Sequence, residues 1–185
     1  MSGELVVVRH ADTDWTQSGQ HTGHTDLPLN GVGRAAAALL ADRLSPWTFS
    51  EVLCSPLERA RETCEIAGYG TRALLRADLI EWDYGRYEGV TTKKIVAERP
   101  GWDLWRDGAP GGESAADVGA RADRVLMSLP QSGVVLVFSH GHFLRVLLAR
   151  WLELEPQAGA LFLLAPGAIA TLRFEHGRRV LGSLG

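Results

Sequence analysis

Residues 5–10 read Leu-Val-Val-Val-Arg-His, a short apolar run that ends in an arginine and a histidine. The run is rich in valine and lacks alternation of apolar and polar residues, a pattern typical of a strand buried on both faces. Two similar runs lie at residues 51–54 and 134–138, and a stretch with helical periodicity follows each of the three. Strands alternating with helices predict the fold class α/β, as a three-layer α/β/α sandwich with a mostly parallel central sheet.

Start signals place the expected helices. Asn30 is a candidate N-cap for the helix that follows the first strand. Residues 55–58, Ser-Pro-Leu-Glu, have the composition of a capping box, which predicts a helix with Ser55 as its N-cap. The remaining expected elements are helices over residues 114–129 and 143–152, closing strands over residues 160–164 and 169–174, and a loop over residues 107–112.

The composition indicates one compact domain over residues 1–185, with 45% hydrophobic and 22% charged residues. Lys and Arg number 19 against 22 Asp and Glu, and the net charge of −3 lacks the basic excess expected of a nucleic-acid-binding surface. No apolar run approaches the roughly 20 residues that span a bilayer, and the first residues do not resemble a signal peptide. We therefore expect a cytoplasmic protein that binds neither nucleic acid nor membrane, and the sequence leaves a homodimer open.

The sequence offers no convincing set of metal ligands. Cys54 and Cys64 are too few and too unclustered for a disulfide scaffold or a zinc site, and we expect them to be buried thiols. His21 and His24 lie near two aspartates in a turn-rich stretch without a fixed helical face, so we expect pocket-wall or surface residues. Neither a metal nor another cofactor is therefore expected.

Charged side chains follow the strands at the edge where a parallel sheet binds its ligands. Arg9 and His10 follow the first strand, Arg59 follows the second, and His140 follows the third. Glu81 comes after a short apolar segment and should lie near the same edge. Gathering cations costs energy unless an anion compensates them, and guanidinium groups bind phosphate in a bidentate manner. The sequence therefore predicts an oxyanion pocket, to which helix N-termini add their positive dipole ends.

The histidines decide the chemistry that such a pocket can perform. A neutral imidazole can attack phosphorus, and nearby guanidinium groups disfavour its protonation, so His10 is the candidate nucleophile. Arg9, Arg59 and His140 would neutralise the charge that spreads over the transferred phosphoryl group. Glu81 is the candidate donor of a proton to the leaving oxygen.

Four segments of the chain resemble the histidine phosphatase superfamily, also called the phosphoglycerate-mutase-like superfamily: residues 5–23, 55–60, 81–89 and 139–141. The match runs almost end to end and includes the Gly-Glu-Ser element at residues 112–114. The resemblance implies a phosphoglycerate mutase-like fold, a phosphohistidine intermediate and no metal. It assigns the intermediate to His10, phosphate binding to Arg9, Arg59 and His140, and proton donation to Glu81.

The resemblance also implies contacts to a small phosphorylated substrate. Thr16 matches the family's phosphate-contacting polar residue, and residues 22–23 match its substrate-contacting Thr-Gly pair. Residues 18–26 resemble the same segment of sedoheptulose-bisphosphatase-like and broad acid phosphatases, which favours a sugar phosphate or another metabolite. The expected substrate contacts are Thr16, Gln20, Thr22, Gly23, Trp82 and Gly141.

Departures from the family pattern bear on the branch and on the reaction. Ala11 replaces the usual glycine of Arg-His-Gly, which adds a methyl group where the backbone is tight. His140-Gly141 replaces the His-Asp of the phytase-like branch and favours Glu81 as the acid. Mutases carry a long insertion between this acid and the second histidine, whereas here 140 − 81 = 59 positions separate them. An open pocket favours hydrolysis, and a cofactor-dependent phosphoglycerate mutase is the alternative.

Two other classes of protein fit the sequence less well. Asp12 and Asp14 after a strand suggest a magnesium-dependent phosphatase of the haloacid dehalogenase type, but no Asp-Asp pair follows and the two lysines lie in a helix-like stretch. A non-enzymatic anion-binding module predicts the loss of a reactive side chain, and all of them are present.

Overall fold

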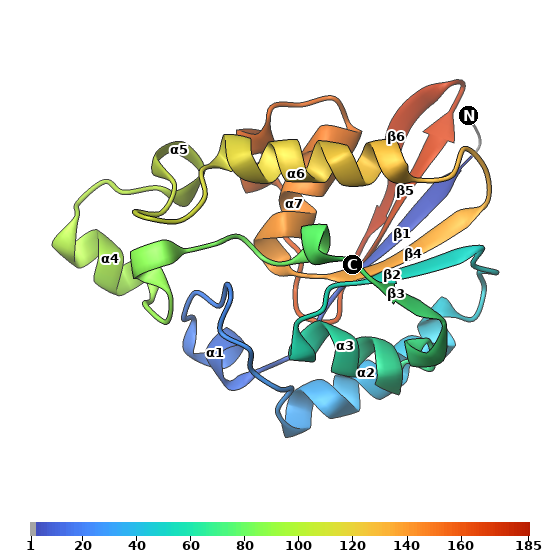
Figure 1. Cartoon of the computed structure of the whole chain (residues 1–185), viewed down its shortest axis with the longest axis horizontal. Helices are drawn as coiled ribbons and strands as arrows, with labels where there is room; N and C mark the ends of the chain where they lie inside the picture. Colours follow the sequence, from blue (N-terminus) through green and yellow to red (C-terminus); the bar gives the residue numbers. More distant parts are fainter. Residues whose placement is uncertain (1–2) are drawn as a thin grey trace.

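A computed structural model describes residues 3–185, in which a six-stranded sheet lies between two layers of helices (Figure 1). The sheet order is β3-β2-β4-β1-β5-β6. Strands β1 to β4 run parallel to one another, β5 pairs antiparallel with β1, and β6 pairs antiparallel with β5. The predicted mostly parallel α/β sandwich is therefore confirmed. The strands are β1 (Glu4–Arg9), β2 (Glu51–Cys54), β3 (Ala73–Leu75), β4 (Val134–Ser139), β5 (Ile169–Glu175) and β6 (Arg178–Leu184).

The apolar runs lack alternation because helices cover both faces of the sheet (Figure 1). In β1, Leu5 and Val7 pack in the cluster with α6 and α7, while Val6 and Val8 pack in the cluster with α2 and α3. All four side chains are at most 1% exposed. The four helices are α2 (Gly31–Leu44), α3 (Glu58–Ile66), α6 (Ala115–Ser128) and α7 (Gly141–Trp151).

Short helices complete the chain. Figure 1 shows that α1, α4 and α5 lie beyond the carboxyl ends of the parallel strands, where residues 83–113 form an excursion from the sheet. Backbone hydrogen bonds join His21 to Val90 and Gly89, which ties this excursion to the loop after β1. The short elements are α1 (Asp14–Ser18), η1 (Gly70–Arg72), η2 (Ala77–Leu79), η3 (Gly85–Tyr87), α4 (Thr92–Glu98), α5 (Leu104–Asp107) and η4 (Pro156–Leu161).

The predicted helix starts have different outcomes. Asn30 caps α2 by accepting from the Gly33 N–H, as predicted. The prediction for Ser55 is wrong: α3 begins at Glu58, and its first N–H donates to the Asp26 carboxylate at 2.6 Å. The Ser55 hydroxyl is instead 2.7 Å from His140 Nε2, because this part of the chain lies against the end of β4.

The end of the chain also differs from the prediction. Residues 160–164 are not a strand, because the 3₁₀ helix η4 runs into them and leaves Leu161 and Leu163 about four-fifths exposed, at 80% and 79%. The strand predicted at residues 169–174 is confirmed as β5. The pattern did not indicate β6, in which arginine and glycine interrupt the apolar positions.

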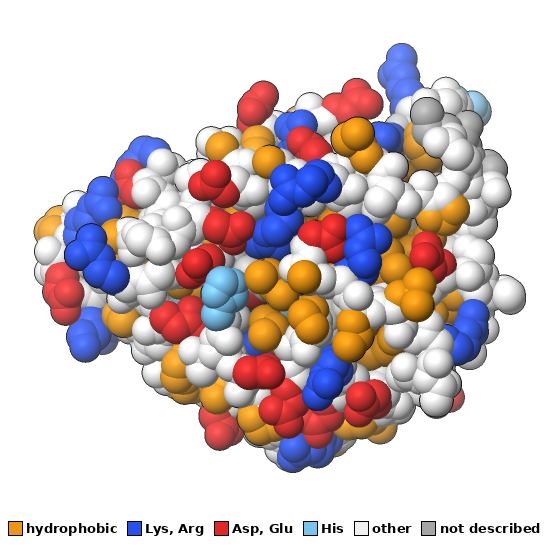
Figure 2. Space-filling view, in the orientation of Figure 1, with side chains coloured by type: hydrophobic (Ala, Val, Ile, Leu, Met, Phe, Trp, Pro, Cys, Tyr) orange, Lys and Arg blue, Asp and Glu red, His pale blue; other side chains and the backbone are white. Residues whose placement is uncertain are grey.

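One face of the molecule is mixed in charge. On the face drawn in Figure 2, acidic and basic side chains lie interspersed among apolar ones. Within residues 3–185, no helix is long and apolar enough to cross a bilayer.

Candidate active site

Sheet order brings the two predicted histidines together. β1 and β4 are parallel neighbours with Arg9 opposite Ser139, so the residues that follow the two strands emerge side by side. The ring centroids of His10 and His140 are 5.2 Å apart. Both side chains are at least 97% buried, with 3% and 0% exposure.

Arg59 joins this pair from the first turn of α3. Its side chain is fully buried, and its guanidinium donates to the backbone carbonyls of Thr22, Gly23 and Thr25 at 2.9–3.0 Å. Arg9 Nη1 donates to the Leu164 carbonyl at 2.5 Å. These bonds hold both guanidinium groups in place but leave the Nε of each without a protein partner.

Glu81 reaches the same edge of the sheet, as predicted from its position after an apolar segment. Its carboxylate accepts from the N–H groups of Trp82, His142 and Phe143 at 2.8–3.1 Å. The last two belong to the first turn of α7, whose dipole attracts negative charge. Glu81 is therefore fixed beside the histidines by backbone groups.

Three buried side-chain nitrogens among the described residues lack a hydrogen-bond partner: Arg9 Nε, Arg59 Nε and His140 Nδ1. Buried polar groups are almost always paired, since an unpaired one costs about 1–3 kcal/mol. All three belong to side chains predicted to bind phosphate. A ligand oxyanion is the partner that suits them, because guanidinium N–H groups bind phosphate oxygens strongly.

The tautomer of His10 follows from one contact. Its Nδ1 lies 2.8 Å from the Ala11 carbonyl oxygen. Because a carbonyl oxygen only accepts, Nδ1 carries the proton and a neutral ring keeps its lone pair on Nε2. Burial, followed by the charges of Arg59 and Arg9, holds the pKa of His10 well below its usual value of 6.5. The imidazole is therefore neutral at neutral pH and has a free nucleophilic nitrogen.

Burial also lowers the pKa values of the side chains around His10. Burial, and then the charge of Arg59, lowers the pKa of His140 well below 6.5. Burial also lowers the pKa of Arg9 and Arg59, while the charge of Glu81 acts in the opposite direction. Both arginines remain charged, because guanidinium does not lose its proton in proteins.

A cavity of about 200 Å³ is lined by Arg9, His10 and Glu81, whereas Arg59 and His140 are not among its lining residues. Three predicted substrate contacts, Thr16, Gln20 and Thr22, line it. The full lining consists of Arg9, His10, Trp15, Thr16, Gly19, Gln20, His21, Thr22, Glu81, Tyr84, Thr92 and His142.

The other three predicted substrate contacts are not among the residues that line this cavity, and each contacts a neighbouring group. Trp82 is fully buried, and its indole N–H donates to the Glu113 carbonyl at 2.9 Å. Gly23 gives its carbonyl to Arg59. At Gly141 a side chain would meet the Arg9 guanidinium at 3.1 Å, so glycine permits the close approach.

Sequence reasoning missed two supporting residues. Thr63 Oγ1 accepts from the Ala11 N–H at 3.1 Å and donates to the Arg59 carbonyl at 2.6 Å. Arg121 donates to the carbonyls of residues 78, 80 and 81 and pairs with Glu113, with a shortest distance of 2.8 Å between charged groups. An arginine on the otherwise apolar face of the helix at residues 114–129 was the available signal.

The remaining histidines and cysteines considered as metal ligands lie apart from one another or are buried. His21 forms a wall of the cavity, and His24 is about half exposed, at 53%, near Asp83. Cys54 and Cys64 are buried free thiols, as predicted. Within residues 3–185 no group of three or more His, Cys, Asp or Glu side chains is arranged to hold a metal ion.

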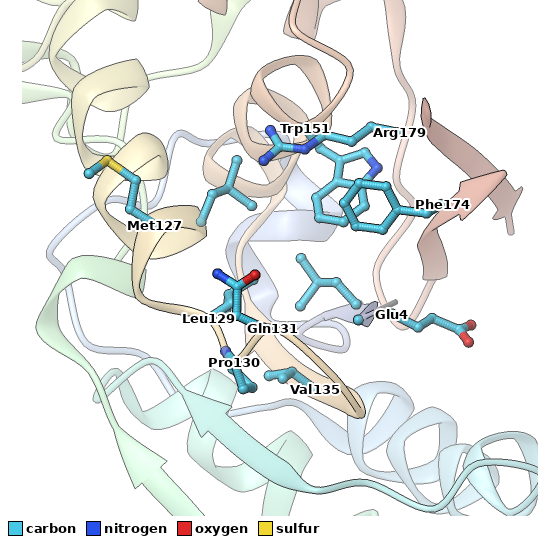
Figure 3. A pocket seen from close by; sticks show the side chains of 12 residues that line it. Glu4, Met127, Leu129, Pro130, Gln131, Val135, Trp151, Phe174 and Arg179 are labelled. Carbon is cyan, nitrogen blue, oxygen red and sulfur yellow. The ribbon is translucent and has the colours of Figure 1, made fainter. Parts of the chain in front are cut away.

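A second hollow of about 290 Å³ lies at the opposite end of the sheet, near the start of β1 (Figure 3). Trp151, Phe174 and Met127 give it an apolar wall, and Arg179 stacks over the Trp151 ring at 5.1 Å. It contains none of the histidines and has no nucleophile beside a phosphate-binding group. The reactive groups therefore converge on the smaller cavity.

Comparisons with known proteins agree with this arrangement. A family model described as the histidine phosphatase superfamily (branch 1) matches residues 5–185. An acid phosphatase of Mycobacterium tuberculosis is 40% identical over 98% of this chain and 91% of its own length. A sedoheptulose 1,7-bisphosphatase of Saccharomyces cerevisiae is 34% identical over 85% of this chain and 70% of its own length. A solved structure of an open reading frame product from M. tuberculosis has a TM-score of 0.94 and 38% identity, covering 99% of this chain and 97% of that one.

Proposed function

Because the chain belongs to the histidine phosphatase superfamily (branch 1) and is a phosphatase of that superfamily, we propose a mechanism built on His10. The enzyme hydrolyses a small phosphomonoester, such as a sugar phosphate, through a phosphohistidine intermediate and without a metal ion. The single observation that carries the proposal is the set of unpartnered nitrogens on Arg9, Arg59 and His140 around a neutral imidazole.

In the first step, His10 Nε2 attacks phosphorus, so that a P–N bond forms and the P–O bond to the leaving alcohol breaks. The guanidinium groups and His140 stabilise the charge on the equatorial oxygens. Glu81 gives its proton to the leaving oxygen. Water then attacks phosphorus and gives a proton back to the Glu81 carboxylate, while the P–N bond breaks and inorganic phosphate and neutral His10 are released.

Hydrolysis is favoured over phosphoglycerate mutase activity for two reasons. The relatives described above carry the names of phosphatases. The chain between Glu81 and His140 is short, and the cavity beside His10 is open to water, which can reach a phosphohistidine there.

Trapping of the intermediate tests the proposal. A radiolabelled phosphomonoester, mixed briefly with the enzyme and quenched in base, should leave acid-labile label on the wild-type protein and none on His10→Ala. His24→Ala is the matched control, because that histidine is exposed and lies outside the cavity lining, and it should retain the label. Label on His10→Ala would contradict the assignment.

A chelator tests metal independence. Turnover of p-nitrophenyl phosphate should be unchanged in excess chelator, because the donors around the phosphate position are guanidinium and imidazole groups. A rate that falls on chelation and returns with a divalent cation would favour a metal-dependent mechanism.

A further inference from the structure

We propose that the enzyme is selective for phosphomonoesters of neutral alcohols and discriminates against esters that carry a second anionic group. This inference rests on the proposed function, since it concerns the part of the same cavity that holds the leaving alcohol. It is carried by the charges, the pairing and the chemistry of the side chains that line the cavity.

Within residues 3–185, the charged side chains that line the cavity leave no free cation for a second anionic group. Within the described residues that line the cavity, Arg9 is the one Lys or Arg side chain and Glu81 is the one carboxylate. Arg9, together with Arg59 outside the lining, is committed to the phosphoryl group through an unpartnered Nε. A second carboxylate or phosphate on the substrate would therefore face Glu81 without a cation of its own.

The two further histidines of the wall do not supply that charge. Burial is the main cause that lowers the pKa of His21, and it lowers the pKa of His142 well below 6.5. His21 Nδ1 lies 2.8 Å from the Val90 carbonyl, and His142 Nδ1 lies 2.6 Å from the Tyr84 hydroxyl. Both rings are neutral at neutral pH and act as flat, weakly polar walls.

Polar side chains of the cavity lining are already paired within the protein. Gln20 Nε2 donates to the Gly89 carbonyl at 2.8 Å, and its Oε1 accepts from Ser18 at 2.6 Å. Thr92 Oγ1 lies 3.4 Å from His21 Nε2. These paired groups and the half-buried indole of Trp15 present an uncharged, partly aromatic wall to the leaving group. Such walls suit a neutral hydroxylated leaving group, whose apolar face can stack on a ring.

Cations close to the cavity are directed elsewhere. Arg145 donates to the carbonyls of Gly159 and Ala160 and stacks over Trp105 at 4.6 Å. Lys94, two residues after Thr92, lines a different hollow on α4. Neither one lines the cavity, so a second anion would lose part of its hydration without gaining an ion pair.

A matched pair of substrates tests the selectivity. Glycerol 3-phosphate and 3-phosphoglycerate differ chiefly in carrying a neutral alcohol or a carboxylate at the far end. We expect kcat/KM to be higher for glycerol 3-phosphate by about tenfold or more, as for one unpaired charged group in a binding site. Equal values, or a preference for 3-phosphoglycerate, would overturn the proposal.

A charge-introducing variant sharpens the test. Thr92→Lys places a cation on the cavity wall and should narrow the ratio between the two substrates by raising kcat/KM for 3-phosphoglycerate. Gln17→Lys is the control, because it adds the same charge on exposed α1 outside the lining and should leave the ratio unchanged. An equal shift in both variants would assign the effect to overall charge and contradict the cavity argument.

Turnover of p-nitrophenyl phosphate distinguishes failure of the proposed selectivity from failure of the proposed function. If the wild-type enzyme hydrolyses this ester but shows no preference between the matched substrates, the selectivity is wrong and the proposed function stands. If it hydrolyses none of the three esters and traps no label on His10, the proposed function is wrong and this inference fails with it.

Discussion

At the residue scale, His10, the proposed nucleophile, contacts a peptide unit that Thr63 holds in place. The Ala11 carbonyl accepts from His10 Nδ1, and the N–H of the same residue donates to Thr63 Oγ1. Thr63 also donates to the Arg59 carbonyl, so one fully buried hydroxyl connects the loop after β1 to the first turn of α3. Thr63 is thus a positioning residue.

Thr63→Val keeps the shape of the side chain and removes both hydrogen bonds. We expect the free energy of unfolding to fall by about 1–3 kcal/mol, because the buried Ala11 N–H loses its partner. We also expect kcat to fall more than KM changes, since His10 loses its fixed orientation. Thr63→Ser retains the hydroxyl and should recover most of kcat. A kcat for Thr63→Val equal to that of the wild type would contradict the positioning role.

Glu81→Gln tests the proton donor. The amide cannot give up a proton in the same way, so hydrolysis of an alkyl ester such as glycerol 3-phosphate should slow far more than hydrolysis of p-nitrophenyl phosphate. The reason is that p-nitrophenolate leaves without protonation. Equal loss on both substrates would indicate that Glu81 only positions neighbouring groups.

The lowered pKa of His10 sets the direction of the pH dependence. Because the pKa lies well below 6.5, the neutral nucleophile persists in mildly acidic solution. The acidic limb of kcat/KM should therefore fall at a pH clearly below 6.5, measured with a substrate whose own ionisation is corrected for. A limb centred at 6.5 would show that His10 titrates as an exposed imidazole.

At the element scale, the start of α2 packs against the loop after β1. The Asn30 N–H donates to the Asp12 carbonyl at 3.0 Å, and Gly33 in the first turn lies directly against that carbonyl. A Cβ on Gly33 would overlap the Asp12 carbonyl oxygen. The glycine is therefore required by this close approach.

A matched pair of substitutions tests this packing. Gly33→Ala should lower the free energy of unfolding by about 1–3 kcal/mol, because either the helix or the loop must shift. Gly31→Ala meets nothing within 4 Å and should be neutral or stabilising by up to about 1 kcal/mol. Denaturant unfolding measures both. An unchanged midpoint for Gly33→Ala would contradict the close contact.

At the scale of the whole molecule, burial of neutral histidines links stability to pH. The pKa values of His10, His140 and His142 all lie well below 6.5 in the folded protein, mainly through burial. Below pH 6.5 the unfolded chain binds protons that the folded protein does not, so the free energy of unfolding falls as the pH falls. Each histidine contributes at most about 1.4 kcal/mol per pH unit in that window.

Denaturant unfolding between pH 7 and pH 5 measures this dependence. The wild-type protein should lose stability toward pH 5, and His140→Asn should show a shallower slope, because one titrating group is removed. The comparison of slopes is independent of any constant loss of stability in the variant. Parallel slopes would contradict the burial of a neutral His140.

The amino-acid pattern alone was sufficient for the α/β layers, for β1, β2 and β4, and for the convergence of Arg9, His10 and His140 at one edge. These features follow from local hydrophobic periodicity and from the rule that parallel strands share a carboxyl edge. Tertiary structure alone decided which partner each polar group meets. The Ser55 hydroxyl meets His140, 85 positions away, instead of capping α3, and Trp82 turns into the core. Periodicity reports burial, whereas hydrogen-bond partners depend on strand order, which brings remote segments into contact.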